Sequence, residues 1–224
     1  MIYGFYHVAV MRDFWKDVFQ EQVTKIKSSG LYDVTEKIYL GIVGNKKVDF
    51  SEFNLDPKFE IMFQYEGSIL SKGELPTIER LHSFCISHPN DKVWYIHTKG
   101  VSRPLGRNIT AWRRYMEYFV IERHQDAIRV LDKYDCCGCD WYTAKEFWQT
   151  YRQAGKPIFC GNFWWANANF IAKLPPINIA YDSRMRAEEW LGEGRPNAFS
   201  LWKSLTCMYT FYYPRSRYAG KRLF

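Results

Sequence analysis

Residues 1–30, MIYGFYHVAVMRDFWKDVFQEQVTKIKSSG, contain the first strand and the first helix of the predicted fold. The stretch Ile2–Val10 is rich in aromatic and β-branched residues, as expected of a buried strand. From Asp13, a predicted N-cap, apolar residues recur at helical spacing until Gly30, which is a suitable helix stop. Residues 36–44 then have the composition of a second strand. A strand, a helix and a strand in this order predict a βαβ unit with parallel strands.

The alternation of strands and helices continues through most of the chain. Pro76 opens a second helix, and the clearest helical pattern covers residues 110–133. Further strands are expected at 59–67, 92–96 and 136–143. Beyond residue 157 a short strand is expected to lead into a helix that ends near Pro175, and another helix follows at 186–191. The 224 residues are therefore predicted to form one α/β, Rossmann-like domain, whose mixed but mainly parallel sheet of about six or seven strands is flanked by helices.

The charge of the chain favours anionic partners. Thirty-one Lys and Arg against 24 Asp and Glu leave a formal charge of +7, which suits a nucleoside diphosphate, a nucleic acid or an acidic membrane surface. The basic residues are dispersed, and no RRM, KH or helix-turn-helix signature is present, which argues against nucleic acid. Nine Trp, 16 Tyr and 16 Phe are more rings than a core of this size needs. Some of these rings are expected to line a site.

The N-terminus shows no targeting signal. The segment MIYGFYHVAV (1–10) is apolar, but no basic region precedes it, and Arg12 and Asp13 end it short of a signal peptide core or a membrane span. Six cysteines in such a chain are expected to be reduced thiols, which predicts a cytoplasmic protein. The run CCGC at 136–139, with Cys160, could suggest zinc. Alternate residues of a strand face opposite ways, however, so buried thiols explain this run better.

The carboxyl ends of the predicted strands select candidate binding residues. In open α/β sheets, ligands bind beyond these ends, where loops and helix N-termini converge. This rule selects His7, Tyr65, His97 and Asp140. The chain contains neither GxGxxG nor GxxxxGK[ST], so a phosphate must be held without these glycine-rich loops.

The loop HTKGVSRPLGR (97–107) follows the fourth strand and is strongly basic. It carries Lys99, Arg103 and Arg107, together with a histidine and two glycines. A lysine point charge and flexible arginine donors suit a diphosphate, so Lys99 and His97 are predicted to lie near phosphates. Tyr65 is predicted near the base or the ribose. The alternative interpretation is a solvated basic connection at the start of the long helix.

Three segments together resemble a known enzyme class. They are YIHTKG (95–100), GNFWWANANFIAKLP (161–175) and RMRAEEWL (184–191). In this order the chain resembles glycosyltransferases of the GT-A type, and more narrowly small soluble members of large DNA viruses and bacteria. The resemblance implies transfer of a sugar from a nucleotide-sugar donor, with a UDP-sugar favoured, to a glycan or glycoprotein hydroxyl, without an organic cofactor. It also implies a donor-binding part at about 1–145, an acceptor-side part at about 146–213 and a basic tail at 214–224.

The chain departs from this class at the expected metal site. GT-A enzymes usually carry Asp-x-Asp after the fourth strand to bind Mn²⁺ or Mg²⁺, whereas this chain has His97, Thr98 and Lys99. The resemblance therefore implies a divalent metal that this motif does not support, and the metal ligands stay unassigned. Asp140 is the nearest carboxylate that could join His97 on a metal, and it is also a candidate donor or acceptor ligand.

The resemblance places a general base in the segment 184–191. Glu188 and Glu189 stand where GT-A folds commonly place this carboxylate, at the start of a helix after the acceptor-side loop. Consecutive helical residues point about 100° apart, so only one of the two can face the site. The resemblance favours Glu188. The alternative is that both carboxylates face solvent.

The turn at Gly161 and Asn162 is predicted to bind sugar. The asparagine can hydrogen-bond hydroxyl groups, while the ring of Trp164 or Trp165 covers an apolar sugar face. On a helix, adjacent positions cannot share one exposure, so one of the two tryptophans is expected to be core.

Two other kinds of protein compete with a transferase. One is a GT-A-like domain that binds nucleotide or sugar without turnover, which the missing Asp-x-Asp favours. The other is a binder of nucleic acid or of an anionic surface, which the charge of +7 favours.

Overall fold

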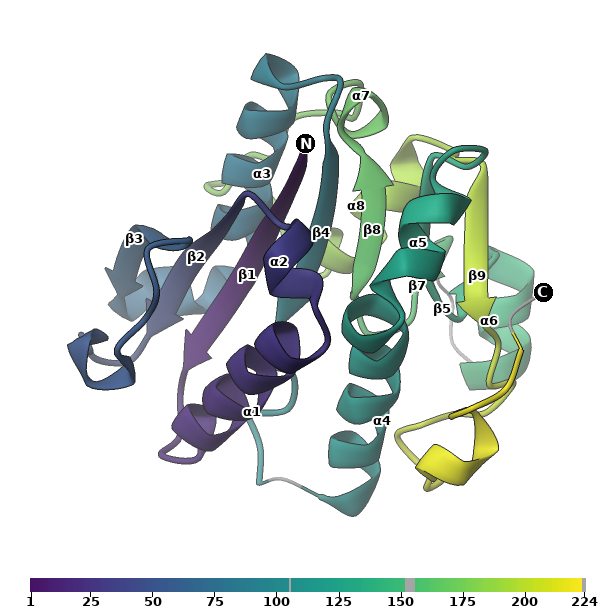
Figure 1. The fold of residues 1–224 in the computed structure, drawn as a ribbon, viewed down its shortest axis with the longest axis horizontal. Coiled ribbons are helices and arrows are strands. Elements are labelled where there is room, and N and C mark those ends of the chain that lie inside the picture. The colour runs from purple at the N-terminus through teal and green to yellow at the C-terminus, as the bar shows by residue number, and fades with distance from the viewer. Residues whose placement is uncertain (105, 152–155, 223–224) are drawn as a thin grey trace.

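The central sheet of the protein contains seven strands within residues 1–104, 106–151 and 156–222, which the computed structural model describes. The strands are β1 (Ile2–Val10), β2 (Lys37–Gly44), β3 (Phe59–Glu66), β4 (Lys92–His97), β5 (Cys136–Cys139), β8 (Trp164–Asn167) and β9 (Ala198–Trp202). Their order across the sheet is β3-β2-β1-β4-β8-β5-β9 (Figure 1). Only β8 runs antiparallel to its neighbours, so the predicted mainly parallel α/β fold is confirmed.

Helices cover both faces of this sheet (Figure 1). The helices are α1 (Trp15–Ser28), α2 (Leu31–Val34), α3 (Leu75–Ser87), α4 (Arg107–Glu117), α5 (His124–Val130), α6 (Ala144–Tyr151), α7 (Ala168–Ile171) and α8 (Arg186–Glu193). Short 3-10 turns are η1 (Ser51–Phe53), η2 (Gly67–Lys72) and η4 (Arg215–Arg217), while β6 (Trp141–Tyr142) and β7 (Ile158–Phe159) form a small antiparallel pair. The side chains of α1, α4 and α5 share one hydrophobic cluster, and those of α3, α7 and α8 share the other.

Strand β1 shows why the fold forms, because both of its faces are buried. Tyr6, Val8 and Val10 pack in the cluster of α1, while Tyr3 and Phe5 pack in the cluster of α3. A strand covered on both faces has a continuous apolar sequence, as Ile2–Val10 does. Because side chains alternate, the next residue after Phe5 on the α3 side is a histidine, which reaches the edge where the strand ends.

The predicted helix over 110–133 is not continuous. A π-helical turn, η3 (Tyr118–Glu122), separates α4 from α5, and the Arg123 N–H donates to the carbonyl of Tyr118 at 2.9 Å. The predicted N-cap Asp13 is also wrong, since α1 is preceded by Phe14 and has no side-chain cap. Helix α6 and strand β9 form in segments for which the sequence analysis predicted neither.

The predicted strand over 136–143 divides at Asp140. This residue has φ +52°, in the left-handed region that Asp tolerates better than most residues. Its carboxylate accepts hydrogen bonds from the Ser204 N–H at 2.6 Å, the Ser204 hydroxyl at 3.0 Å and the Tyr142 hydroxyl at 3.2 Å. These three donors hold the bend and direct the chain from the central sheet into β6.

Trp164 and Trp165 lie on a strand, which corrects the helical placement used in the sequence analysis. Strand β8 lies between β4 and β5, so its two faces are covered by opposite layers. Trp164 stacks on Tyr95 at 5.1 Å between ring centroids, and the Trp165 indole N–H donates to the carbonyl of Val120 at 2.9 Å. Alternation on a central strand therefore buries both rings, whereas a helix would have exposed one.

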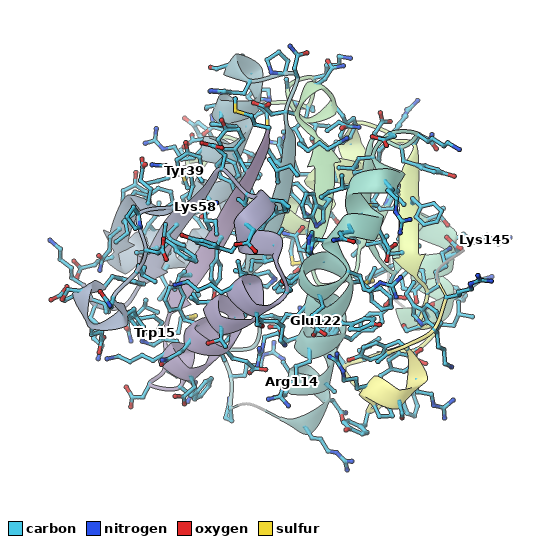
Figure 2. All side chains as sticks on the ribbon, viewed as in Figure 1. Trp15, Tyr39, Lys58, Arg114, Glu122 and Lys145 are labelled. Carbon is cyan, nitrogen blue, oxygen red and sulfur yellow. The ribbon has the colours of Figure 1, made fainter. Side chains whose placement is uncertain are left out.

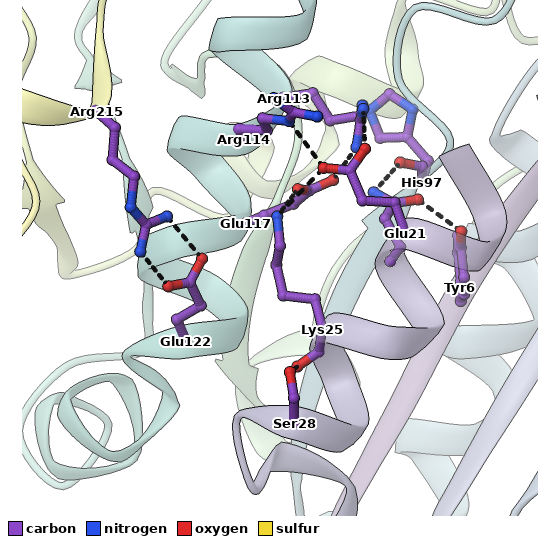
Figure 3. A network of polar contacts seen from close by, with 11 residues as sticks. Tyr6, Glu21, Lys25, Ser28, His97, Arg113, Arg114, Glu117, Glu122 and Arg215 are labelled. Carbon is purple, nitrogen blue, oxygen red and sulfur yellow. Dashed lines mark hydrogen bonds and ion pairs between the residues drawn. The ribbon is translucent and has the colours of Figure 1, made fainter. Parts of the chain in front are cut away.

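A buried ion-pair network joins α1 to α4 (Figure 3). Glu117 accepts hydrogen bonds from Lys25 and Arg113, each at 2.6 Å, and Glu21 contacts Arg113 at 2.8 Å. On the same face of the sheet, Trp15 packs against aromatic rings of the β2–β3 connection (Figure 2). Apolar and charged contacts thus both hold α1 in place. Within the described residues, no helix is long and apolar enough to cross a membrane.

Candidate active site

A cavity of about 260 Å³ lies at the carboxyl ends of β1, β2 and β4. Its other walls are the start of α3, the loop after β4, the start of α8 and Tyr209 from the C-terminal segment. This is the edge where parallel α/β sheets bind ligands. Among the predicted residues, the structure brings His7, His97, Lys99 and Glu188 to this one cavity.

Lys99 provides the central cation of the cavity. Its Nζ lies 3.9 Å from the centroid of the Trp112 ring, a cation–π contact that holds the ammonium without neutralising it. No Asp or Glu oxygen in the described part of the chain forms an ion pair with it. Burial lowers the pKa of Lys99 from its ordinary value, and the more distant charges of Glu188 and Glu74 partly offset this effect. An ammonium in this setting is stabilised by an anionic ligand.

Arg103, Arg184 and Glu188 also belong to the charged lining of the cavity. Arg103 comes from the loop after β4, and Arg184 lies two residues before the start of α8. Glu188 belongs to the first turn of α8 and lines the same cavity. The site therefore combines three cations, which suit a diphosphate, with a carboxylate that can accept a proton.

His97 is neutral in this cavity, and its tautomer follows from its contacts. Its Nε2 lies 3.0 Å from the carbonyl of Gly161, which can only accept, so Nε2 carries the proton. Burial, with the nearby charge of Lys99, lowers the pKa of His97 to about 3. His7 is similar: its Nδ1 lies 2.9 Å from the Thr77 hydroxyl, and burial lowers its pKa to about 4.

Glu74 is a site residue that the sequence analysis missed. It directly precedes α3 and lines the cavity. Its Oε2 accepts hydrogen bonds from the Tyr95 hydroxyl at 2.8 Å and from the Asn162 amide at 2.7 Å, while its Oε1 lies 3.8 Å from Nδ1 of His97. The sequence did contain a signal for Glu74: it is an acidic residue directly before the Leu-Pro pair that starts the helix after the third strand.

The turn at Gly161 and Asn162 supports these two residues from behind. Both residues have left-handed backbone, with φ +93° and +60°. The backbone carbonyl of Gly161 fixes His97, and the side-chain NH₂ of Asn162 fixes Glu74. Oδ1 of Asn162 in turn accepts a hydrogen bond from the Trp164 indole N–H at 2.8 Å. A side chain at Gly161 would meet the Met116 sulfur at 2.5 Å. The predicted sugar-binding turn is thus placed to position site residues, and neither of its residues lines the cavity.

Five other predicted ligands also lie outside the cavity lining: Tyr65, Asp140, Trp164, Trp165 and Glu189. Tyr65 stacks on Phe63 at 4.5 Å between ring centroids, and Glu189 pairs with Lys156 at 3.2 Å. Burial raises the pKa of Asp140 to about 6, although its hydrogen bonds oppose this shift. Of the two adjacent glutamates, Glu188 is therefore the one that faces the cavity.

The loop after β4 does not fit a divalent metal. At the Asp-x-Asp position Thr98 accepts a hydrogen bond from the Ala9 N–H at 2.8 Å, and Lys99 carries a positive charge. Residues 1–104, 106–151 and 156–222 contain no group of three His, Cys, Asp or Glu side chains placed to hold a metal ion. Burial also raises the pKa of the Cys136, Cys137 and Cys139 thiols, which disfavours the thiolate form that zinc binds.

Comparisons with known proteins give a family but no activity. The sequence model of a family described as a domain of unknown function (DUF8361) matches residues 5–212. No curated protein matches the sequence. A crystal structure of a "putative nucleotide-diphospho-sugar transferase" from Desulfovibrio desulfuricans G20 aligns over 90% of this chain and 80% of that chain, at 11% identity and a TM-score of 0.45. A TM-score of 0.45 assigns no activity to this chain.

Proposed function

This chain belongs to the family described as a domain of unknown function, DUF8361, and this description names no activity. We therefore propose an activity from the residues that line the cavity. The protein is a glycosyltransferase that moves a sugar from a nucleoside-diphosphate sugar, with a UDP-sugar favoured, to a hydroxyl of a glycan or glycoconjugate. In this proposal residues of about 1–145 bind the donor, and residues of about 146–213 contribute the acceptor side.

The unneutralised ammonium of Lys99 carries this proposal. It lies in a cavity at the carboxyl ends of three parallel strands, beside a tryptophan ring and without an ion-pair partner in the described residues. Arg103 and Arg184 line the same cavity, so its three cations outnumber its two carboxylates, Glu74 and Glu188. A diphosphate supplies the missing negative charge, and hydrogen bonds between charged groups are about twice as strong as neutral ones.

Different residues of the cavity serve different steps of glycosyl transfer. The acceptor hydroxyl oxygen forms a bond to the anomeric carbon, the bond from that carbon to the diphosphate breaks, and its electron pair leaves with the diphosphate. Lys99 and the arginines stabilise the charge that develops on this leaving group. Glu188 accepts the proton of the acceptor hydroxyl, and direct attack on the face of the anomeric carbon opposite the diphosphate inverts that carbon.

In this proposal, cationic side chains of the cavity do what a metal ion does in other transferases. A metal neutralises the leaving diphosphate, and Lys99 with Arg103 and Arg184 can do so directly. We therefore expect donor binding without a divalent ion.

A thermal-shift panel tests the proposal. UDP, GDP, dTDP and CMP are each added with Mn²⁺ and with a chelator, and at least one diphosphate should raise Tm in both conditions. Lys99→Ala should weaken that binding by about 1 to 3 kcal/mol, the range for a hydrogen bond to a charged group. Lys145→Ala, which removes an exposed lysine of α6 (Figure 2), is the matched control and should bind normally.

Two results would contradict the proposal in different ways. If no nucleotide shifts Tm, or if Lys99→Ala binds like the control, the diphosphate site is wrong. If a nucleotide sugar binds but neither transfer nor hydrolysis releases the diphosphate, the protein is a binding domain without turnover.

A further inference from the structure

Two polar atoms face one another in the cavity wall at a distance too long for a hydrogen bond between them. Oε1 of Glu74 lies 3.8 Å from Nδ1 of His97, and the two side chains are only 16% and 13% exposed. Nε2 of His97 donates to the Gly161 carbonyl, so in the neutral ring Nδ1 carries a lone pair. The carboxylate can likewise only accept. Neither atom can satisfy the other.

Surrounding hydrogen bonds hold both groups in this arrangement. Oε2 of Glu74 accepts from the Tyr95 hydroxyl and from the Asn162 amide, which leaves Oε1 as the oxygen directed at His97. The ring of His97 also packs edge-on against Phe163 at 5.0 Å between centroids. The two side chains are therefore held in place before a ligand arrives, and Oε1 and Nδ1 stay available to the donors of a ligand.

We propose that this acceptor pair, Oε1 of Glu74 and Nδ1 of His97, binds two neighbouring hydroxyl groups of the nucleotide-sugar donor. A vicinal diol presents two O–H donors side by side, and each can satisfy one of the facing acceptors. The diol belongs either to the transferred sugar or to the ribose. The inference rests on the proposed function and specifies how the donor is recognised.

The other charges of the cavity favour neutral donors over a cation. Lys99, Arg103 and Arg184 line the same space and would repel an ammonium or metal ion placed between Glu74 and His97, and Glu188, the other carboxylate of the lining, offsets only part of this repulsion. Hydroxyl groups carry no charge to be repelled. A polyhydroxylated ligand with a diphosphate matches both groups of lining residues, because the cations bind the phosphates and the acceptor pair binds the hydroxyl groups.

Glu74→Gln tests this inference without removing the contacts that support the fold. The Gln carbonyl can still accept from Tyr95 and Asn162, while its NH₂ takes the place of Oε1 and donates to His97. The variant thus satisfies the pair internally, and its Tm should match that of the wild type. Glu79→Gln is the control for the charge change, because Glu79 belongs to helix α3, which Glu74 directly precedes, but does not line the cavity.

Calorimetric titration uses inorganic pyrophosphate, UDP, 2′-deoxy-UDP and UDP-glucose, with the guanosine set of GDP, 2′-deoxy-GDP and GDP-mannose in parallel. Glu74→Gln should bind pyrophosphate at least as well as the wild type, because it removes a negative charge. If the diol is on the sugar, Glu74→Gln should lose affinity only for the nucleotide sugar, by about tenfold or more. If the diol is on the ribose, Glu74→Gln should lose the same affinity for every ribonucleotide and nucleotide sugar, whereas its affinity for the 2′-deoxynucleotides should not change.

The opposite results are equally clear. The inference is overturned if the affinity of Glu74→Gln for every probe stays within about twofold of wild type, or matches that of Glu79→Gln. It is also overturned if the variant loses as much affinity for pyrophosphate as for the nucleotides. A wild-type protein that binds pyrophosphate but no nucleotide also overturns it. A wild-type protein that binds none of these probes refutes the proposed function itself, before the acceptor pair comes into question.

Discussion

Replacing Glu117 with Gln should lower the free energy of unfolding by about 3 kcal/mol. The Glu117 side chain is 0% exposed and accepts from Lys25 and Arg113, each at 2.6 Å (Figure 3). Gln keeps the shape but removes the charge, and breaking a buried ion pair costs about 3 to 5 kcal/mol. Glu21 still contacts Arg113 at 2.8 Å in the variant, which favours the lower end of this range.

Urea unfolding, followed by tryptophan fluorescence, measures this loss. For a slope of about 3 kcal/mol per molar urea, a loss of about 3 kcal/mol moves the midpoint down by about 1 M. Glu122→Gln is the matched control, because Glu122 also pairs with an arginine, but there the arginine, Arg215, is 53% exposed (Figure 3). An exposed pair contributes about 1 kcal/mol at most. Equal midpoint shifts in the two variants, or no shift for Glu117→Gln, would refute the argument that burial makes the network costly to break.

Three further predictions address the site. Glu188→Gln should keep donor affinity while turnover falls by about 10² or more, since Gln cannot take a proton; an equal loss of both in rate and binding assays would indicate a structural role. Gly161→Ala should destabilise the protein more than Gly67→Ala, because both residues have positive φ but only the Cβ at Gly161 meets neighbouring atoms; equal urea midpoints would contradict this. Stability should increase from pH 5 to 7, because burial lowers the pKa of His7 to about 4 and of His97 to about 3, so both take up protons on unfolding below their ordinary value of 6.5. Asp140, whose pKa burial raises to about 6, acts in the opposite direction but is one group against two. A urea midpoint that falls as the pH rises over this interval would exclude buried neutral histidines as the main contributors.

Local patterns in the sequence were sufficient for the fold class and for part of the site. Apolar character on both faces of Ile2–Val10, followed by a helical period, specifies a strand in a covered parallel sheet. The ends of such strands meet at one edge, so His97 and Lys99 could be assigned to it from their positions alone. Helical geometry also explains why only one of Glu188 and Glu189 reaches the cavity, but the choice of Glu188 came from the resemblance.

Only the tertiary structure decided which residues surround that edge. Strand β8 pairs antiparallel between β4 and β5, and this non-local pairing buries both Trp164 and Trp165 and turns Asn162 toward Glu74. No local spacing encodes such a pairing, because the partners are far apart in sequence and are selected by the packing of the complete sheet. The acceptor pair of Glu74 and His97 depends on it for the same reason: its two members lie on different elements, and residues of a third segment orient them both.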